Sequence, residues 1–479
     1  MPGGSVLRRP LPTILSFAAL GLATWGLSGC ATYREQPVDL AAFDAQWRTR
    51  HQQGEAVASF ARDLDERGAA VPMRIVLDDG IDLGEAEVLV LVWNPTLRQA
   101  RAQAGVAAAE ADHAGAFDAP QIEFDALHAL ESVANPWKLA GALSVSLPLS
   151  GRLGLQRAHA ERVADAERQL LLTQEWSTLA VLRDAWIAWS AVTVEQFQAK
   201  AFADDVAQLE SIAARLRDAG ELSSVAARAV RIAGLRATLT ARELLAEAER
   251  QRLGLLALMG LAPDAPLTLH PTLRLGDDLM QRLGDAQVPD DPRLRTALAA
   301  HQVAEAKLRL EVRRQYPDLR LGLGFEDDRG DQSLGPVLGF SIPLWNTNAQ
   351  AIAGADATRA ATAEQIAAAY AAALFDRAQA RLVLNDRRAR LAEMENTLVP
   401  LVDAQLSDTR RLADLGELDV ALLLEVFDAA WTCKRDLVHL RADLAQAHNR
   451  LIALALPGWM TSKNELTAED AERAEGVKP

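Results

Sequence analysis

The chain has 479 residues, a formal net charge of −15 and few aromatic side chains. This acidity disfavours a nucleic-acid partner, because nothing would offset repulsion from the phosphates, and the richness in alanine and leucine is typical of long helices. The eight histidines and two cysteines form no metal-ligand pattern, and no nucleophile and base stand at a recognisable spacing. We therefore expect no enzyme, no metal site and no other cofactor.

The first 29 residues are expected to be an export signal. Arg8 and Arg9 precede an apolar run over 11–25, and Leu27-Ser28-Gly29-Cys30 follows. The small residues before Cys30 resemble the lipobox of bacterial lipoproteins, which implies cleavage there and a covalent lipid on Cys30, with sorting to the outer membrane. The alternative is an ordinary cleaved signal followed by an incidental cysteine. No later run of about 18 apolar residues occurs, so we predict no membrane-spanning helix beyond the leader.

An internal duplication at an offset of about 197 residues is the most informative feature of the chain. Asn94-Pro95 recurs as Asp291-Pro292, and Asp218-Ala219-Gly220 recurs as Asp414-Leu415-Gly416. Matches in a fixed order over such a distance predict one structural unit built twice. We place the units at 81–262 and 291–457, with the acylated segment at 30–80, a linker at 263–290 and a polar tail at 458–479. Residues 31–80 and 263–290 are expected to be irregular.

Each unit is predicted to begin with a helix and continue with a β-hairpin. Asn94-Pro95 and Asp291-Pro292 place a capping residue before a proline, which favours a helix start. Apolar and small residues then alternate over 138–149, 319–325 and 338–344, with a weaker strand at 119–130 and loops at 131–137 and 326–333. Trp137 and Trp345 stand at strand ends, where membrane-interface aromatics belong. The pattern suits transmembrane strands or a soluble, half-buried hairpin.

Long helical runs follow the hairpins, over 152–218 and 349–414. Gly220 and Gly416 are expected to end them, and shorter helices return to about residues 260 and 456. Apolar residues at alternating spacings of three and four, such as 391, 394, 398 and 401, predict seams between packed helices. The only cysteine besides Cys30 is Cys433, which we expect to be a small packing residue within a helix.

Four strands cannot close a barrel, and open strand edges in lipid would leave backbone groups unsatisfied. Other copies of the chain are therefore needed. Two copies would supply eight strands and three would supply twelve, and only the larger number readily leaves a channel.

With these motifs the chain resembles the outer-membrane efflux protein family, the TolC-like exit ducts, over residues 80–457. The resemblance rests on the duplicated Asn/Asp-Pro-x-Leu motif, the duplicated Pro-Leu strand ends, and the two Arg-x-x-x-x-Gly-x-x-Ser/Asp motifs at 215–223 and 411–419. It implies a mainly α fold with transmembrane β-strands, assembled as a homotrimer with a 12-stranded β-barrel continued by a 12-helix periplasmic α-barrel. It also implies a lipid-anchored protein of a Gram-negative outer membrane. Drugs or metal ions would pass through it from an inner-membrane efflux transporter and a periplasmic adaptor protein.

The resemblance also assigns roles to individual residues. It places adaptor-binding tips at Arg215, Gly220, Glu221, Ser223, Arg411, Gly416, Glu417 and Asp419, and a periplasmic gate at Leu422 and Glu425. The simpler interpretation is that the glycines only cap helices and that Glu425 is a solvated helix residue. The rival function is a periplasmic structural or adaptor lipoprotein without a pore, although such a protein would normally have one helical hairpin rather than two.

Overall fold

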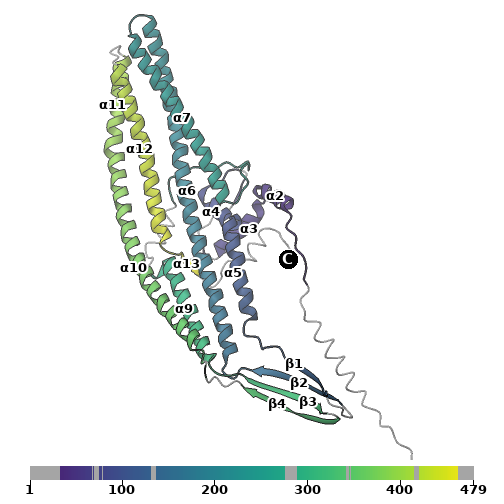
Figure 1. Ribbon diagram of the computed structural model, residues 1–479. Helices are drawn as coiled ribbons and strands as arrows, with labels where there is room; N and C mark the ends of the chain where they lie inside the picture. Colours follow the sequence, from purple (N-terminus) through teal and green to yellow (C-terminus); the bar gives the residue numbers. More distant parts are fainter. Residues whose placement is uncertain are drawn as a thin grey trace, which may run out of the picture. The chain divides into compact units, whose positions relative to one another are not determined.

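The computed structural model describes residues 33–66, 68–69, 75–77, 79–130, 136–275, 288–328, 330–340, 345, 347–414 and 420–461. The chain divides into two compact units, 1–47 and 48–479. The described part of the first unit forms most of helix α2 (Leu40–Arg48), in which the rings of Phe43 and Trp47 lie 6.3 Å apart. All the other elements belong to the second unit (Figure 1).

The second unit confirms that one order of elements is built twice. Its first half holds η1 (Arg50–Gln52), α3 (Gly54–Glu66), α4 (Leu83–Trp93), α5 (Pro95–His113), β1 (Gln121–His128), β2 (Trp137–Leu147), α6 (Arg152–Asp218) and α7 (Ser224–Leu258). Its second half holds η2 (Val288–Asp290), α9 (Pro292–Arg313), β3 (Leu319–Asp328), β4 (Asp331–Phe340), α10 (Ala349–Glu393), the π-turn η3 (Met394–Leu398), α11 (Val399–Asp414), α12 (Val420–Ala453) and α13 (Gly458–Thr461). Each half therefore runs helix, β-hairpin, long helix, return helix.

The predicted helix starts are confirmed at α5 and α9. The Asn94 side chain accepts a hydrogen bond from the Leu97 amide at 3.0 Å, and the Asp291 side chain accepts one from the Arg293 amide at 2.9 Å. In both helices a proline follows the cap, where its missing N–H leaves no hydrogen bond unmade. The duplicated dipeptides are thus duplicated helix N-termini.

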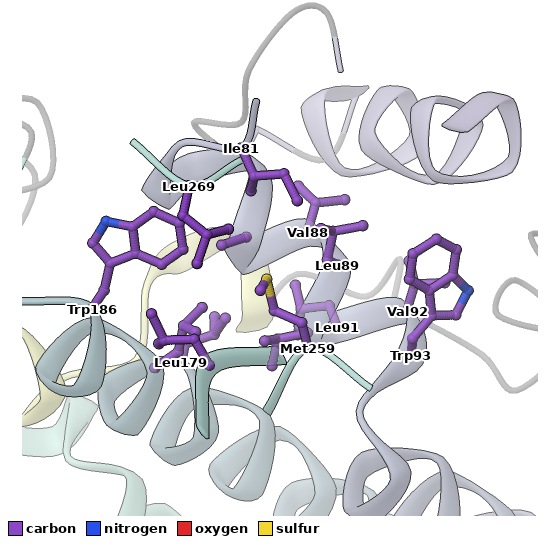
Figure 2. Close-up of a cluster of buried hydrophobic side chains, with 14 of the residues drawn as sticks. Ile81, Val88, Leu89, Leu91, Val92, Trp93, Leu179, Trp186, Met259 and Leu269 are labelled. Atoms are coloured by element: carbon purple, nitrogen blue, oxygen red, sulfur yellow. The ribbon is translucent and has the colours of Figure 1, made fainter. Parts of the chain in front are cut away.

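The expectation that residues 31–80 are irregular is wrong. Helices α2 and α3 lie within that segment, and the apolar face of α3 is buried at Val57, Phe60 and Leu64. This face joins the largest apolar core, which also contains α4 and side chains from α6, α7 and α12. Figure 2 shows α4 side chains gathered with Leu179 and Trp186 of α6. The Pro, Gly and Asp residues of this segment suggested an irregular chain, but the segment contains a short amphipathic helix that tertiary packing stabilises.

Gly260 closes this core after α7. It has φ of 69°, and a Cβ added there would lie 2.1 Å from the Trp93 carbonyl oxygen. We expect Gly260→Ala to destabilise the fold by about 2–4 kcal/mol, because it combines left-handed strain with overpacking. Thermal unfolding followed by circular dichroism would measure this loss.

Gly254→Ala is the matched control for that substitution. Gly254 lies within α7, and an added Cβ would meet nothing within 4 Å. Alanine should raise the stability there by up to about 1 kcal/mol, because it is the better helix former. Equal effects of the two substitutions would contradict the packing assigned to Gly260.

The two long helical runs have the predicted bounds but differ in continuity. Helix α6 is unbroken from Arg152 to Asp218, whereas the equivalent run from Ala349 to Asp414 contains the π-turn η3. Pro400 follows this turn, and its ring would clash with the carbonyl of residue 396 in a regular α-helix. The wider π-turn just before the proline leaves room for the ring, so the clash is avoided without ending the helix. Within the described ranges, no helix is both long and apolar enough to cross a membrane.

The four strands form one antiparallel sheet in the order β1-β2-β3-β4. The pairing of β2 with β3, which sets Leu143 opposite Leu323, joins the two halves of the duplication. The predicted loop over 326–333 is wrong, because β3 continues to Asp328 and β4 begins at Asp331. Charged residues at that end take part in the strand pairing, with Asp328 opposite Asp331.

Candidate functional site

One face of the sheet is apolar and uncovered. The register sets Ile122, Leu143, Leu323 and Pro336 in one row across all four strands, and Phe124, Gly141, Phe325 and Leu334 in another. Ile122, Phe124 and Leu334 are each more than 70% exposed in the single chain. Large contiguous apolar surfaces are rarely left to water, so this face requires an apolar environment or another chain.

The opposite face of the sheet carries small and charged side chains. Arg320 of β3 forms an ion pair with Glu123 of β1 at 3.3 Å, across the intervening strand. Lys138 of β2 contacts Glu326 and lies 3.7 Å from Asp328. The two faces therefore differ in polarity over most of their area, as expected of strands that separate an apolar medium from water.

The sheet has two open edges. In the described part of the chain, β1 pairs only with β2 and β4 pairs only with β3. Each outer strand thus presents a row of unpaired backbone donors and acceptors. An apolar face combined with two open edges makes this sheet incomplete as a single chain.

A charged cluster lies where the helices approach the sheet. The carboxylate of Glu311 in α9 is buried and accepts hydrogen bonds from Asn348 and Arg314, each at 2.9 Å, and it pairs with Lys307. Half-buried His159 of α6 lies beside this cluster. Its pKa is lowered from the ordinary value of 6.5, first by burial and then by the positive charges of Lys307 and Arg314.

The lowered pKa of His159 predicts a pH dependence of stability. Because the folded state disfavours the imidazolium, the stability present above pH 6.5 should fall as acidification protonates the unfolded chain and then the native histidine. His159→Gln should reduce the slope of stability against pH below that value while changing little at pH 8. Unfolding midpoints between pH 5 and 8 would measure this slope. An unchanged slope would contradict the assignment.

The first predicted tip lies between α6 and α7. Gly220 has φ of 80°, as a left-handed helix end requires, and the Ser223 hydroxyl accepts a hydrogen bond from the Ala226 amide at 3.1 Å. Arg215 and Glu221 are exposed. Gly220 and Ser223 therefore have structural roles in the turn, and two charged side chains remain free to face solvent or a partner.

The second tip is described only in part. Arg411 of α11 is exposed and lies 3.8 Å from Asp408, whereas Gly416, Glu417 and Asp419 fall outside the described residues, as does Cys30. In the predicted gate, Leu422 and Glu425 are exposed on α12, while Val420, Leu423 and Val426 of the same helix are buried. The two gate residues thus share a face that points away from the core of the protomer.

The structure brings the two halves together near these tips. Leu209 and Ala213 of α6 and Val230 of α7 form a small core with Val420 and Leu423 of α12. Arg410 of α11 lies 3.4 Å from Asp205 of α6 and stacks over Phe427 at 5.3 Å. Arg410 was not predicted, because its only signal in the sequence is its position beside Arg411.

A polar contact fixes α12 against α6 farther along the same seam. The buried Asn449 amide donates hydrogen bonds to the Ala180 carbonyl and to Asp184, each at 2.8 Å. Single buried polar groups of this kind specify the register of packed helices. The return helix of the second half is thereby held on the long helix of the first.

No family model and no curated protein sequence matches the chain. Solved structures do match. The outer-membrane channel OprN superposes with a TM-score of 0.66 at 18% identity, covering 90% of this chain and 99% of its own. The chain has the fold of the TolC-like outer-membrane efflux proteins.

Two further structures of this fold cover most of their own length. The outer-membrane protein VceC of Vibrio cholerae matches with a TM-score of 0.65 at 16% identity, over 78% of this chain and 95% of its own. The CmeC outer-membrane channel of Campylobacter jejuni matches with a TM-score of 0.65 at 13% identity, over 83% and 90%. The TolC-like fold expected from the duplicated motifs is thus confirmed.

Proposed function

We propose that this TolC-like protein is the outer-membrane exit duct of a tripartite efflux system. The observation that carries the proposal is the four-stranded sheet, which has one uncovered apolar face, one charged face and two open edges. A periplasmic protein would have to leave that apolar face in water or cover it with another chain. In a membrane, the same face lies against lipid and the charged face lines a wet lumen.

Completion of the sheet calls for further copies of the chain. Three copies supply twelve strands, remove every open edge and leave room for a lumen, whereas two copies supply only eight. The homotrimer would continue below the membrane as an α-barrel of twelve helices, four from each chain. This count supports the trimer that the family resemblance implies.

The remaining roles follow from the family resemblance. Cys30 would carry the lipid that anchors the mature protein to the outer membrane. Exposed Arg215, Glu221 and Arg411 would face a periplasmic adaptor that joins the duct to an inner-membrane transporter. Glu425 and Leu422, which point away from the protomer core, would narrow the periplasmic end. Substrates such as drugs or metal ions would pass through without reaction.

The decisive experiment measures the oligomeric mass of the mature protein in detergent and then the planar-bilayer conductance of the same fraction. A conducting trimer is the expected result. A monomer that does not conduct, and that stays soluble when acylation is blocked, would instead support a periplasmic lipoprotein without a pore.

A further inference from the structure

A groove lies between α7 and α12, the return helices of the two helical hairpins, and α6 forms its floor. Helix α6 packs against both of them (Figure 1). Phe202 lines the floor, Arg236 and Thr240 line the α7 wall, and Asp428 and Trp431 line the α12 wall. The groove encloses about 260 Å³, slightly less than the sites that hold drug-sized molecules, about 300–1,000 Å³. It therefore has room for a small ligand.

Three aromatic side chains line this groove. The rings of Phe202 and Trp431 are stacked, with their centroids 5.5 Å apart and their planes at 18° to each other. Phe427 lies one turn before Trp431, and the Arg410 guanidinium lies over its ring at 5.3 Å. All three rings are only partly buried. Aromatic rings left partly open in a recessed site favour a ligand that brings a ring of its own.

Two opposite charges line opposite walls of the groove. Arg236 on α7 and Asp428 on α12 are both exposed. Among the described residues, neither side chain forms an ion pair with the other or with a third residue. Arg410, which lies over the neighbouring Phe427, already pairs with Asp205. The groove thus keeps a cation and an anion apart, and it is complementary to a ligand that carries both a carboxylate and an ammonium group.

The groove and the proposed gate lie on different sides of α12. The buried face of this helix is centred on Ala430. At about 100° per residue, Leu422 and Glu425 flank that face on one side, whereas Asp428 and Trp431 flank it on the other. A ligand in the groove would therefore not lie in the path that the gate residues are proposed to narrow.

We propose that this groove binds a small aromatic zwitterion, of which an aromatic amino acid is the simplest example. The ligand's carboxylate would accept hydrogen bonds from Arg236, its ammonium group would donate to Asp428, and its ring would lie against Trp431 and Phe202. A bound ligand would touch α6, α7 and α12 at once and so hold the two hairpins together. The site is formed by a single chain and does not depend on the duct proposed above.

A saturation-transfer NMR titration of the detergent-solubilised protein tests the class of ligand. L-Tryptophan supplies both charges and a ring, and a ligand of its size is expected to bind with a dissociation constant on the order of 1 mM or lower. Indole lacks both charges and L-leucine lacks the ring, so each should bind about tenfold more weakly or worse. The absence of saturable tryptophan binding up to about 10 mM, or indole binding as tight as that of tryptophan, would overturn the proposal.

Substitution of the two charged residues tests the site. Arg236→Met and Asp428→Asn should each weaken the binding of tryptophan about tenfold, because each removes one charged hydrogen-bond partner. Arg242→Met on α7 and Glu425→Gln on the gate side of α12 are matched controls outside the groove, and should leave the binding unchanged. Unchanged binding in both groove variants, or equal losses in the controls, would overturn the assigned site.

Analogues that lack one charge test the individual contacts. L-Tryptophan amide has no carboxylate, so Arg236→Met should no longer weaken its binding, and N-acetyl-L-tryptophan has no ammonium group, so Asp428→Asn should no longer weaken its binding. Losses that persist with the matching analogue would contradict the assigned contacts. A conducting trimer that binds no tryptophan would refute this site and leave the duct standing, whereas a monomer that binds tryptophan without conducting would refute the duct alone.

Discussion

Glu175→Ala is expected to destabilise the fold by about 3–5 kcal/mol, because it leaves the Arg101 guanidinium buried without its counter-charge. Glu175 of α6 and Arg101 of α5 are 0% and 3% exposed at their side chains. The Arg101 Nε donates to Glu175 Oε1 at 2.9 Å, and Arg101 also donates to the Leu91 carbonyl. This pair ties α5 and α6 to α4. Chemical unfolding of the detergent-solubilised protein, followed by circular dichroism, would measure the loss.

Two controls isolate the buried charge as the cause. Arg101→Leu combined with Glu175→Leu should recover most of the stability, since no uncompensated charge remains in the core. Arg441→Ala removes an ion pair of similar geometry, 2.7 Å from Glu395, but both partners are well exposed, so its cost should be at most about 1 kcal/mol. A Glu175→Ala cost as small as that of Arg441→Ala would contradict the assigned burial.

Leu143→Arg is expected to prevent stable insertion of the sheet into the outer membrane. Leu143 lies near the middle of β2 on the apolar face, between Ile122 and Leu323. A lipid-facing arginine at the membrane midplane costs about 2–4 kcal/mol per chain, and a trimer would carry three. The amount of heat-resistant trimer in outer-membrane fractions would report the loss.

Ala142→Arg provides the matched control for the opposite face. Ala142 is the neighbour of Leu143 and pairs with Glu123 and Gly324 among the small and charged residues. An arginine there should be tolerated during insertion, and should change the conductance instead. If the two substitutions impair insertion equally, the assignment of lipid and lumen faces is wrong.

Features that depend on residues close together in the chain could be predicted from the sequence. The bounds of α6 and of the 349–414 run were correct because capping and turn residues, such as Gly220, act through their own backbone conformation. The alternation of apolar and small residues in β2 and β3 predicted a sheet with one apolar and one polar face for a similar reason, since successive side chains of a pleated strand point to opposite faces. The duplication supplied the order of the elements, because two copies of one pattern must fold in the same way.

Features that depend on contacts between residues far apart in the chain could not be predicted from local sequence patterns. Leu391, Met394, Leu398 and Leu401 were predicted to form a seam between packed helices, but within the protomer Met394 is buried whereas Leu398 and Leu401 are exposed. Arg101 and Glu175 stand 74 residues apart and give no local signal of their pairing. Helix α3 escaped prediction because it is short and is stabilised by the core that covers it.

The sequence by itself determined the duplicated order of helices and strands, the two-faced strands and the helix ends, because capping, turn preference and periodicity act within a few residues. Only the tertiary structure decided that β2 pairs with β3 and that Asn449 fixes α12 on α6. These features join residues far apart in the chain. Their free energy depends on which surfaces remain after every other element has packed.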